Sequence, residues 1–506
     1  MKKYDCLVVG AGNSGLVSAL SLVNDGYKVL VLEKNNNIGG LSRSLVKGRF
    51  EFETSLHNLY LNGTSLNEYR IENILKNNNV SNEINFSTIS ELCRVITPEI
   101  DYTMPLGINK FTKKMEEIVP GSEESIKLFF DLAKESREAL DYIVKNKDNV
   151  DYDYIKENYN NFMRIASYSV SKVLDTIGMP IKAQEIINIM WIYFGSTETE
   201  LSFVEYAVFM LNAIEYGLQV PSDRSYDVSL TLADAFLSRG GEIRYNNEVI
   251  NLLVDDGKIN GVKLKDGEII YANKVIVNSL LSNVYGKLID ANEIPRKALK
   301  NINKRELGGR LFSVHLGLNR SAKELGLENY SYIIYQSLDS DVEYNRMKQL
   351  TNGNQVAIVH NNAIKNASPA GTCMISLNTV FFDDSFGKSL EKENYYEEID
   401  EIVHRLIEVF EKNTKVRILD YIEEIEIVSP IDNIEISGAL DGNTYGYKLT
   451  GLDNLLPRLL NSKNEAYIEG LYTCGGFDGD LYGYNSSFAS GIDVYKSVKK
   501  DIVGDK

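Results

Sequence analysis

The sequence predicts an α/β protein in which a Rossmann-like dinucleotide-binding domain is interleaved with an α+β substrate domain and a helical cap. A glycine-rich turn at residues 10–15 follows an apolar strand pattern and precedes a helical one. Helical patterns dominate 110–215, and shorter apolar segments separated by tight-turn signals follow them. A chain of 506 residues, 43% apolar and 25% charged, has room for two or more such domains.

The first element is a strand–helix–strand unit, with a strand at 4–10, a helix at 14–25 and a strand at 28–32. In the turn GAGNSG, Gly10 permits the sharp exit from the strand, and Gly12 lets a pyrophosphate approach the backbone. Gly15 lets the helix pack closely on the sheet. Asn13 and Ser14 open the helix, whose free N–H groups would face the phosphates. This pattern predicts a dinucleotide site.

An acidic residue, Glu33, ends the second strand 18 residues after Gly15, and Lys34 follows it. A carboxylate at this place can accept hydrogen bonds from both ribose hydroxyls of an adenosine and would repel a 2′-phosphate. The turn alone does not distinguish NAD from FAD.

The helical region contains two unusually apolar segments, AQEIINIMWIYF (183–194) and FVEYAVFMLNAI (203–214). They are either core helices between subdomains or the wall of a pocket for an apolar substrate. For the region as a whole we expect the pocket. The apolar helices also offer a surface for peripheral membrane contact.

After the helical region, a helix is expected to end at Gly240–Gly241, followed by a β-meander with tight turns at Asp256–Gly257 and Asp266–Gly267. Residues 300–430 mix strands with a charged helix, and 466–500 give a strand, a glycine-rich turn and a last helix. We therefore divide the chain into dinucleotide-binding parts at 1–90, 221–290 and 431–506, a helical cap at 91–220 and a substrate domain at 291–430.

Charge and cysteine usage exclude several classes of protein. The net charge of −17 argues against nucleic acid and anionic lipid headgroups as partners. No apolar run reaches 18 residues, and no signal-peptide cleavage site follows the short basic start. The four cysteines are scattered, which predicts neither disulfides nor a metal site and is typical of the reducing cytoplasm.

The C-terminal stretch EGLYTCGGFDGDLYGYNSSFASGIDVYKSV (469–498), together with the glycine pair in EKNNNIGGLSRS (33–44), resembles the amine oxidase and phytoene desaturase superfamily of flavoproteins. This resemblance implies a tightly held FAD, with its adenine end on 10–33 and its flavin end near 475–488. Beyond the first turn, the implied FAD contacts are Gly39, Gly40, Leu41, Ser42, Arg43, Val249, Gly475, Gly476, Asp478, Ser486 and Ser487.

The segment FEFETSLHNLY (50–60) resembles the phytoene desaturase and retinol saturase branch of that superfamily. His57 would lie beneath the flavin ring, where it would orient substrate or donate a proton; alternatively it is a buried histidine satisfied by backbone. The chain departs from the family pattern at Ser55, at 221–227 and at Gly476. We still expect FAD binding despite these departures, but we do not assign one particular reaction of the family to this chain.

The resemblance implies an FAD-dependent oxidoreductase that transfers hydride between flavin and a C–C bond of an elongated apolar substrate, such as a polyene, isoprenoid or lipid-like molecule. It would act as a desaturase or a saturase with an unidentified electron acceptor or donor. The alternatives are an amine oxidase-like enzyme using Tyr482 and Tyr484, a flavin-mediated isomerase and a non-catalytic FAD or lipid carrier. The sequence does not determine the oligomeric state.

Overall fold

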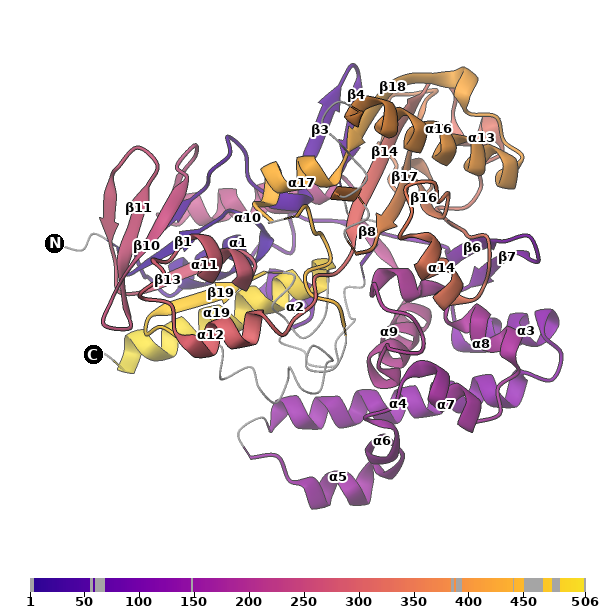
Figure 1. Ribbon diagram of the computed structural model, residues 1–506, viewed down its shortest axis with the longest axis horizontal. Helices are drawn as coiled ribbons and strands as arrows, with labels where there is room; N and C mark the ends of the chain where they lie inside the picture. Colours follow the sequence, from indigo (N-terminus) through magenta and orange to yellow (C-terminus); the bar gives the residue numbers. More distant parts are fainter. Residues whose placement is uncertain are drawn as a thin grey trace.

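The computed structural model describes residues 4–54, 58–59, 69–146, 149–383, 386–387, 394–439, 441–449, 467–475 and 483–504. A smaller sheet lies on one side of the molecule, a larger sheet lies on the other, and a lobe of helices extends from the larger one (Figure 1). The predicted α/β fold is confirmed, because the smaller sheet is parallel and helices pack on it.

The smaller sheet has five described strands, all parallel, in the order β19-β13-β1-β2-β9. The strands are β1 (Cys6–Val9), β2 (Val29–Leu32), β9 (Glu242–Arg244), β13 (Val275–Asn278) and β19 (Leu471–Cys474). The central strands are apolar and buried, as expected where both faces of a parallel sheet are covered. The chain therefore builds this one sheet from three distant segments.

Helices cover one face of the smaller sheet and a β-meander covers the other. The helices are α1 (Asn13–Asn24), α10 (Ser225–Ser238) and α19 (Gly483–Gly504), and the meander strands are β10 (Val249–Asp255), β11 (Lys258–Leu264) and β12 (Ile269–Tyr271). Helix α19 packs directly on α1, where a Cβ at Gly491 would lie 2.7 Å from the Ser14 carbonyl oxygen. A glycine is therefore needed at this crossing.

The larger sheet has seven described strands in the order β18-β14-β17-β16-β15-β6-β7, and only the β15–β6 pair is parallel. They are β6 (Glu91–Ile96), β7 (Asp101–Pro105), β14 (Arg310–Leu318), β15 (Ser331–Ile334), β16 (Gln355–Val359), β17 (Cys373–Phe381) and β18 (Ile422–Val428). Alternate side chains such as Phe312 and Val314 pack under α16 (Tyr395–Thr414). The opposite face points to the interior of the molecule.

The segment expected to be a helical cap, 91–220, begins with two strands of this sheet. Strand β6 pairs with β15, whose residues Tyr332 to Ile334 lie far along the chain from Arg94 to Ile96. The helical boundary predicted at residue 91 is therefore wrong, and the helices of this segment begin at Ile108. The prediction failed because the pairing of β6 with β15 joins residues that are distant in sequence.

The helical lobe packs beneath the inner face of the larger sheet (Figure 1). Its helices are α3 (Ile108–Ile118), α4 (Glu123–Lys145), α5 (Tyr152–Asn158), α6 (Asn160–Ile165), α7 (Val170–Thr176), α8 (Ile181–Ile187) and α9 (Phe203–Tyr216), with the 3-10 turn η3 (Ile189–Tyr193). The α4 face carrying Phe129 and Phe130 is buried, and Phe129 meets Phe203 edge-on at 5.5 Å. Within the described part of the chain, we find no helix with the length and apolar character needed to cross a bilayer.

Shorter elements connect these parts: β3 (Ser44–Lys47), β4 (Phe50–Glu53), β5 (Phe86–Thr88), β8 (Gln219–Pro221), η1 (Gly40–Ser42), α2 (Ile71–Asn77), α11 (Leu281–Lys287), α12 (Arg296–Ile302), α13 (Ala322–Leu325), α14 (Ser340–Arg346), η4 (His360–Asn362), η5 (Leu419–Tyr421) and α17 (Pro430–Ser437). Helix α17 leaves the larger sheet after β18 and reaches the smaller one, where Lys34 Nζ donates to the Glu435 carbonyl at 2.7 Å. The two sheets are thereby linked at one edge.

Candidate functional site

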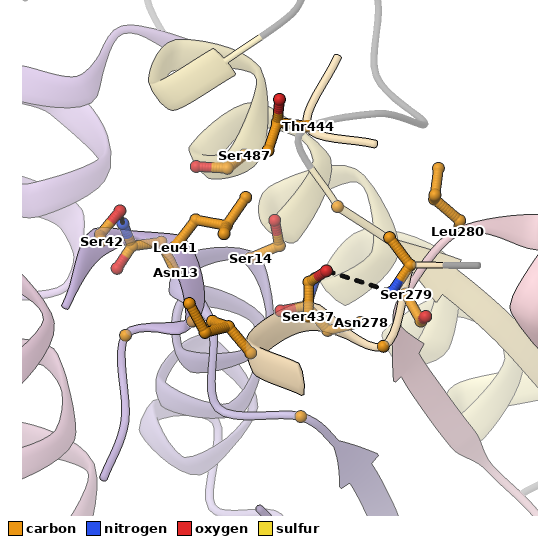
Figure 2. Close-up of a pocket in the computed structure, with 18 of the residues that line it drawn as sticks. Asn13, Ser14, Leu41, Ser42, Asn278, Ser279, Leu280, Ser437, Thr444 and Ser487 are labelled. Carbon is orange, nitrogen blue, oxygen red and sulfur yellow. Dashed lines mark hydrogen bonds between the residues drawn. The ribbon is translucent and has the colours of Figure 1, made fainter. Parts of the chain in front are cut away.

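A cavity of about 520 Å³ lies where the strands of the smaller sheet end, and it extends toward the larger sheet. Residues following β1, β2, β13 and β19 line it, so it occupies the carboxyl edge at which open parallel sheets bind ligands. Its volume is that of a small-molecule or cofactor site, which spans roughly 300–1,000 Å³. Figure 2 shows Ser14, Leu41, Ser437 and Thr444 arranged around this space.

The three glycines of the first turn are each required by close approach. Gly10 has φ +97°, which side chains other than glycine rarely adopt. A Cβ on Gly12 would lie 2.5 Å from Asn278 Oδ1, and one on Gly15 would lie 2.3 Å from the Gly10 carbonyl. Gly10 and Gly12 line the cavity, whereas Gly15 does not and serves the packing of the turn.

Glu33 is buried at the end of β2 and holds the same turn. Its carboxylate accepts hydrogen bonds from the backbone N–H of Ala11 at 2.8 Å and of Asn35 at 2.9 Å. The Asn35 side-chain amide also donates to it, at 3.0 Å. Three of about four acceptor positions are thus in use, which leaves about one for a ribose hydroxyl. Glu33 lines the cavity, as the predicted role requires.

The start of α1 forms an anion site. The helix begins after Gly12 without a side-chain cap, so the N–H groups of its first turn point toward the cavity end without a capping partner. Ser14 is 1% exposed, lines the cavity, and its hydroxyl has no hydrogen-bond partner in the described part of the protein. A phosphate oxygen would accept hydrogen bonds from the N–H groups of the first turn and from the Ser14 hydroxyl, so the site fits a pyrophosphate.

Asn13 locks the neighbouring elements together. Its amide donates to Ser42 Oγ at 3.1 Å and accepts from Ser229 Oγ at 2.7 Å, which ties α1 to η1 and α10. Asn13 therefore holds these elements together and, because it lines the cavity, can also contact a ligand.

The glycine pair lies directly against the first turn. Gly39 N–H donates to the Ala11 carbonyl at 2.9 Å, and a Cβ on Gly40 would be 3.5 Å from Gly12 Cα. Leu41, Ser42 and Arg43 follow and all line the cavity. Arg43 Nε is buried without a hydrogen-bond partner among the described residues, and burial lowers the pKa of this guanidinium. The side chain is placed to meet an anionic or carbonyl group of a ligand.

The far end of the cavity, beside Glu33, is lined by Lys34 and Val249. Burial lowers the pKa of Lys34, whose ammonium is held by the Glu435 carbonyl. Val249 is 8% exposed at the start of β10. Both predicted contacts thus lie on the cavity wall.

Only some of the FAD contacts predicted near the C-terminus line the cavity. Gly475 and Ser487 line the cavity, the first at the end of β19 and the second in the first turns of α19. Ser486 is 2% exposed and is not part of the lining. Gly476, Asp478 and the proposed catalytic His57 lie outside the described residues.

Helix α17 and the residues after it form a part of the wall that sequence reasoning missed. They contribute Asn433, Ile436, Ser437, Gly438 and Ala439, and Thr444 and Tyr445 follow. The sequence does carry start and stop signals for this helix. Ser429 and Asp432 form a capping box at its start, and Gly438 ends the helix with φ +77°. These signals give no indication that the helix covers the cavity.

The end of the cavity toward the larger sheet is aromatic, and the described residues that line it carry no charge. Tyr193 and Phe194 come from η3 and its end, Phe209 comes from α9, and Leu311 begins the inner face of β14. Phe194 and Phe209 meet edge-on with centroids 4.9 Å apart. Both apolar segments singled out in the sequence therefore contribute to the wall. The charged lining residues in the described part are at the other end: Glu33, Lys34, Arg43, Glu248 and Lys287.

A buried acid lies just behind the cavity. Glu53 is 4% exposed and accepts hydrogen bonds from the Ser225 N–H at 2.8 Å and from the Ser225 hydroxyl, which fixes β4 to the start of α10. Burial raises the pKa of Glu53 to about 7 despite these bonds. The next residue, Thr54, lines the cavity. Within the described residues, no group of three or more His, Cys, Asp or Glu side chains could hold a metal ion.

Solved structures share this fold. An oxidoreductase from Methanosarcina mazei superposes with a TM-score of 0.65 at 14% identity, covering 98% of this chain and 100% of that one. The cyclohexylamine oxidase of Brevibacterium oxydans IH-35A gives 0.62 at 14% identity, covering 99% of both chains. The fold and the dinucleotide turn thus define an α/β protein built like these oxidoreductases.

Residues 13–420 match the family described as flavin containing amine oxidoreductase, and the chain belongs to this family. Family membership implies a flavin cofactor and agrees with the superfamily resemblance seen in the sequence.

Three relatives place the chain near the predicted branch. The 4,4'-diapophytoene desaturase of Methylomonas sp is 22% identical over 62% of this chain and 61% of its own length. The human all-trans-retinol 13,14-reductase is 23% identical over 67% of this chain and 58% of its own length. The all-trans-retinol 13,14-reductase of Danio rerio is 23% identical over 95% of this chain and 84% of its own length. Against the first two relatives, the chain spans about three fifths of their length.

Proposed function

We propose that this protein is an FAD-dependent oxidoreductase that transfers hydride between the flavin and a C–C bond of an elongated, largely apolar polyene. One observation carries the proposal: a single cavity joins an anion-binding end, built by α1 and η1, to an aromatic end whose described residues carry no charge. The first end suits a pyrophosphate, and the second suits a conjugated hydrocarbon.

FAD, rather than a shorter flavin, suits the length of the polar end. The wall runs from Arg43 and Ser14 past the start of α1 to Glu33, Lys34 and Val249. An adenosine linked through a pyrophosphate would fill this run, with the remaining acceptor position of Glu33 directed at the ribose.

When bound, the flavin supplies or accepts a hydride at its ring. The chain's own residues place the reactants. Phe194 and Phe209 would orient the polyene by ring contacts, and the apolar side chains around it would exclude water from the reacting bond. Burial raises the pKa of the Tyr193 and Tyr445 phenols, so both stay protonated and neither adds charge beside the substrate. A separate electron acceptor or donor would complete a net redox cycle.

A C–C bond is favoured over a C–N bond by the charge of the wall. An amine substrate is a cation at neutral pH, and burying a cation without a carboxylate partner is costly. The described residues of the aromatic end include no carboxylate. The names of the relatives, which describe a diapophytoene desaturase, a retinol reductase and a prolycopene isomerase, support polyenes as the substrate class.

The test is a set of anaerobic mixing experiments on the purified, FAD-loaded protein. Photoreduced enzyme that is reoxidised by a polyene, with two hydrogens added to the product, shows a saturase. Oxidised enzyme that is bleached by a more saturated polyene, with two hydrogens removed, shows a desaturase. Either result supports the proposal. Bond isomerisation without net change of the flavin, bleaching by amines, or a flavin that reacts with neither substrate class would overturn it in favour of the isomerase, amine oxidase or carrier, respectively.

A further inference from the structure

A second, much smaller cavity lies behind the aromatic end of the main one. Its volume is about 10 Å³, which is the space that one water-sized oxygen group occupies. Tyr193, Leu311 and Tyr445 line both cavities, so a single layer of side chains separates them. Other walls come from the inner face of β17, including Asn378 and Val380.

Tyr335 lines this small cavity and lacks a hydrogen-bond partner. It follows β15, is 1% exposed, and its hydroxyl makes no hydrogen bond within the described part of the chain. Trp191 packs beside the ring with centroids 6.2 Å apart, which restricts its movement. Burial and the neighbouring Tyr193 and Tyr445 raise the pKa of Tyr335. The phenol is therefore a protonated donor, and leaving a buried donor unbonded is unfavourable.

The polar residue closest to hand within the same wall is already engaged. Asn378 accepts a hydrogen bond from Ser313 Oγ at 2.7 Å and donates to the Val356 carbonyl at 3.0 Å. Its amide thus has partners on both sides. Gln355 Oε1, in the same wall, also has no hydrogen-bond partner within the described residues, so a hydroxyl group entering the cavity could accept from Tyr335 and donate to Gln355.

We propose that the small cavity binds a hydroxyl or carbonyl oxygen at one end of the substrate, and that Tyr335 donates the hydrogen bond that recognises it. This inference rests on the proposed function. The polyene would lie along Phe194 and Phe209, and its polar end would pass the layer formed by Leu311 and Tyr445 when one of these side chains turns. A substrate with hydrocarbon ends would leave the Tyr335 phenol unbonded, so the site selects polyene alcohols and aldehydes.

The test compares all-trans-retinol with its deoxy analogue, in which a methyl group replaces the hydroxymethyl group. Each is titrated into the FAD-loaded protein, and binding is read from the change in the flavin absorption spectrum. The wild-type protein should bind the alcohol about tenfold more tightly, which is the effect of one buried hydrogen bond. Tyr335→Phe should reduce this ratio to about one, through weaker binding of the alcohol alone.

Tyr332→Phe is the matched control, because Tyr332 lies on β15 three residues before Tyr335, is fully buried and packs on the opposite face under α16. It should leave the ratio unchanged. Thermal unfolding of the ligand-free Tyr335→Phe protein should be unchanged or slightly higher, since an unbonded hydroxyl is removed. A ratio that stays the same in Tyr335→Phe, with or without loss of stability, would mean that the cavity holds only a trapped water, and would overturn the inference. Equal wild-type binding of both probes also overturns it, whereas failure of the wild type to bind either one overturns the proposed function itself.

Discussion

The buried carboxyl of Glu53 should make the stability of the protein fall as pH rises through the neutral range. The pKa of Glu53 in the fold is about 7, against 4.5 for an unperturbed glutamate. Below pH 4.5 the folded and unfolded chains both hold this proton. Between pH 4.5 and 7 the unfolded chain releases it while the folded chain keeps it, so ionisation favours unfolding.

The size of the effect follows from the shift. A pKa raised from 4.5 to about 7 corresponds to about 3 kcal/mol of stability, which is lost as the pH rises from 4.5 to 8. Glu53→Gln has no proton to lose. Its amide can still accept from the Ser225 N–H and donate to the Ser225 hydroxyl, so the link between β4 and α10 remains.

Thermal unfolding followed by circular dichroism at pH values from 4.5 to 8 measures this effect as a difference between proteins. The melting temperature of Glu53→Gln minus that of the wild type should rise with pH by a few degrees. Glu51→Gln, on the same strand but partly exposed, is the matched control and should show no such trend. A Glu53→Gln difference that stays constant with pH would refute the reasoning.

Three further substitutions test the cavity. Gly15→Ala should prevent flavin retention and lower the melting temperature, because the new Cβ would lie 2.3 Å from a backbone oxygen; a yellow, stable variant would contradict this. Ser14→Ala should weaken FAD binding about tenfold or more, measured by fluorescence of released flavin, with the apoprotein as stable as before; unchanged affinity would remove the hydroxyl from the anion site. Phe209→Ala should weaken polyene binding in spectral titrations without changing FAD affinity, since it removes an aromatic wall distant from the phosphate end; a loss of FAD instead would show that the two ends are not separate.

The polar end of the site was predictable because its determinants are local in sequence. Gly10, Gly12 and Glu33 belong to one strand–helix–strand unit, and their spacing alone places them around a turn. Glu33 nevertheless has a second role that spacing does not reveal. Its hydrogen bonds to Ala11 and Asn35 use most of its acceptor capacity to hold the turn.

The features that sequence reasoning missed depend on contacts between distant segments. Strands β6 and β7 form a local hairpin that joins the rest of the larger sheet through β15, so the place of this hairpin in the sheet could not be assigned before the distant partner was known. Helix α17 has clear start and stop residues, but its position over the cavity is fixed by Lys34 and Asn35, some 400 residues earlier. Tyr335 is one of 31 tyrosines, and nothing in its local sequence distinguishes a buried donor from a packing ring.

The composition of the smaller sheet from three distant segments has a consequence for biosynthesis. Strand β19 and helix α19 supply the edge of the sheet and the surface that covers α1, yet β19 begins 447 residues after α1 ends (471 − 24). Until they emerge, the part of α1 that faces α19 is uncovered, although α1 already packs on β1, β2 and α10, and the nascent chain exposes this apolar surface. Because Gly475 and Ser487 line the cavity, its wall is complete only after residues 471–504 have been translated.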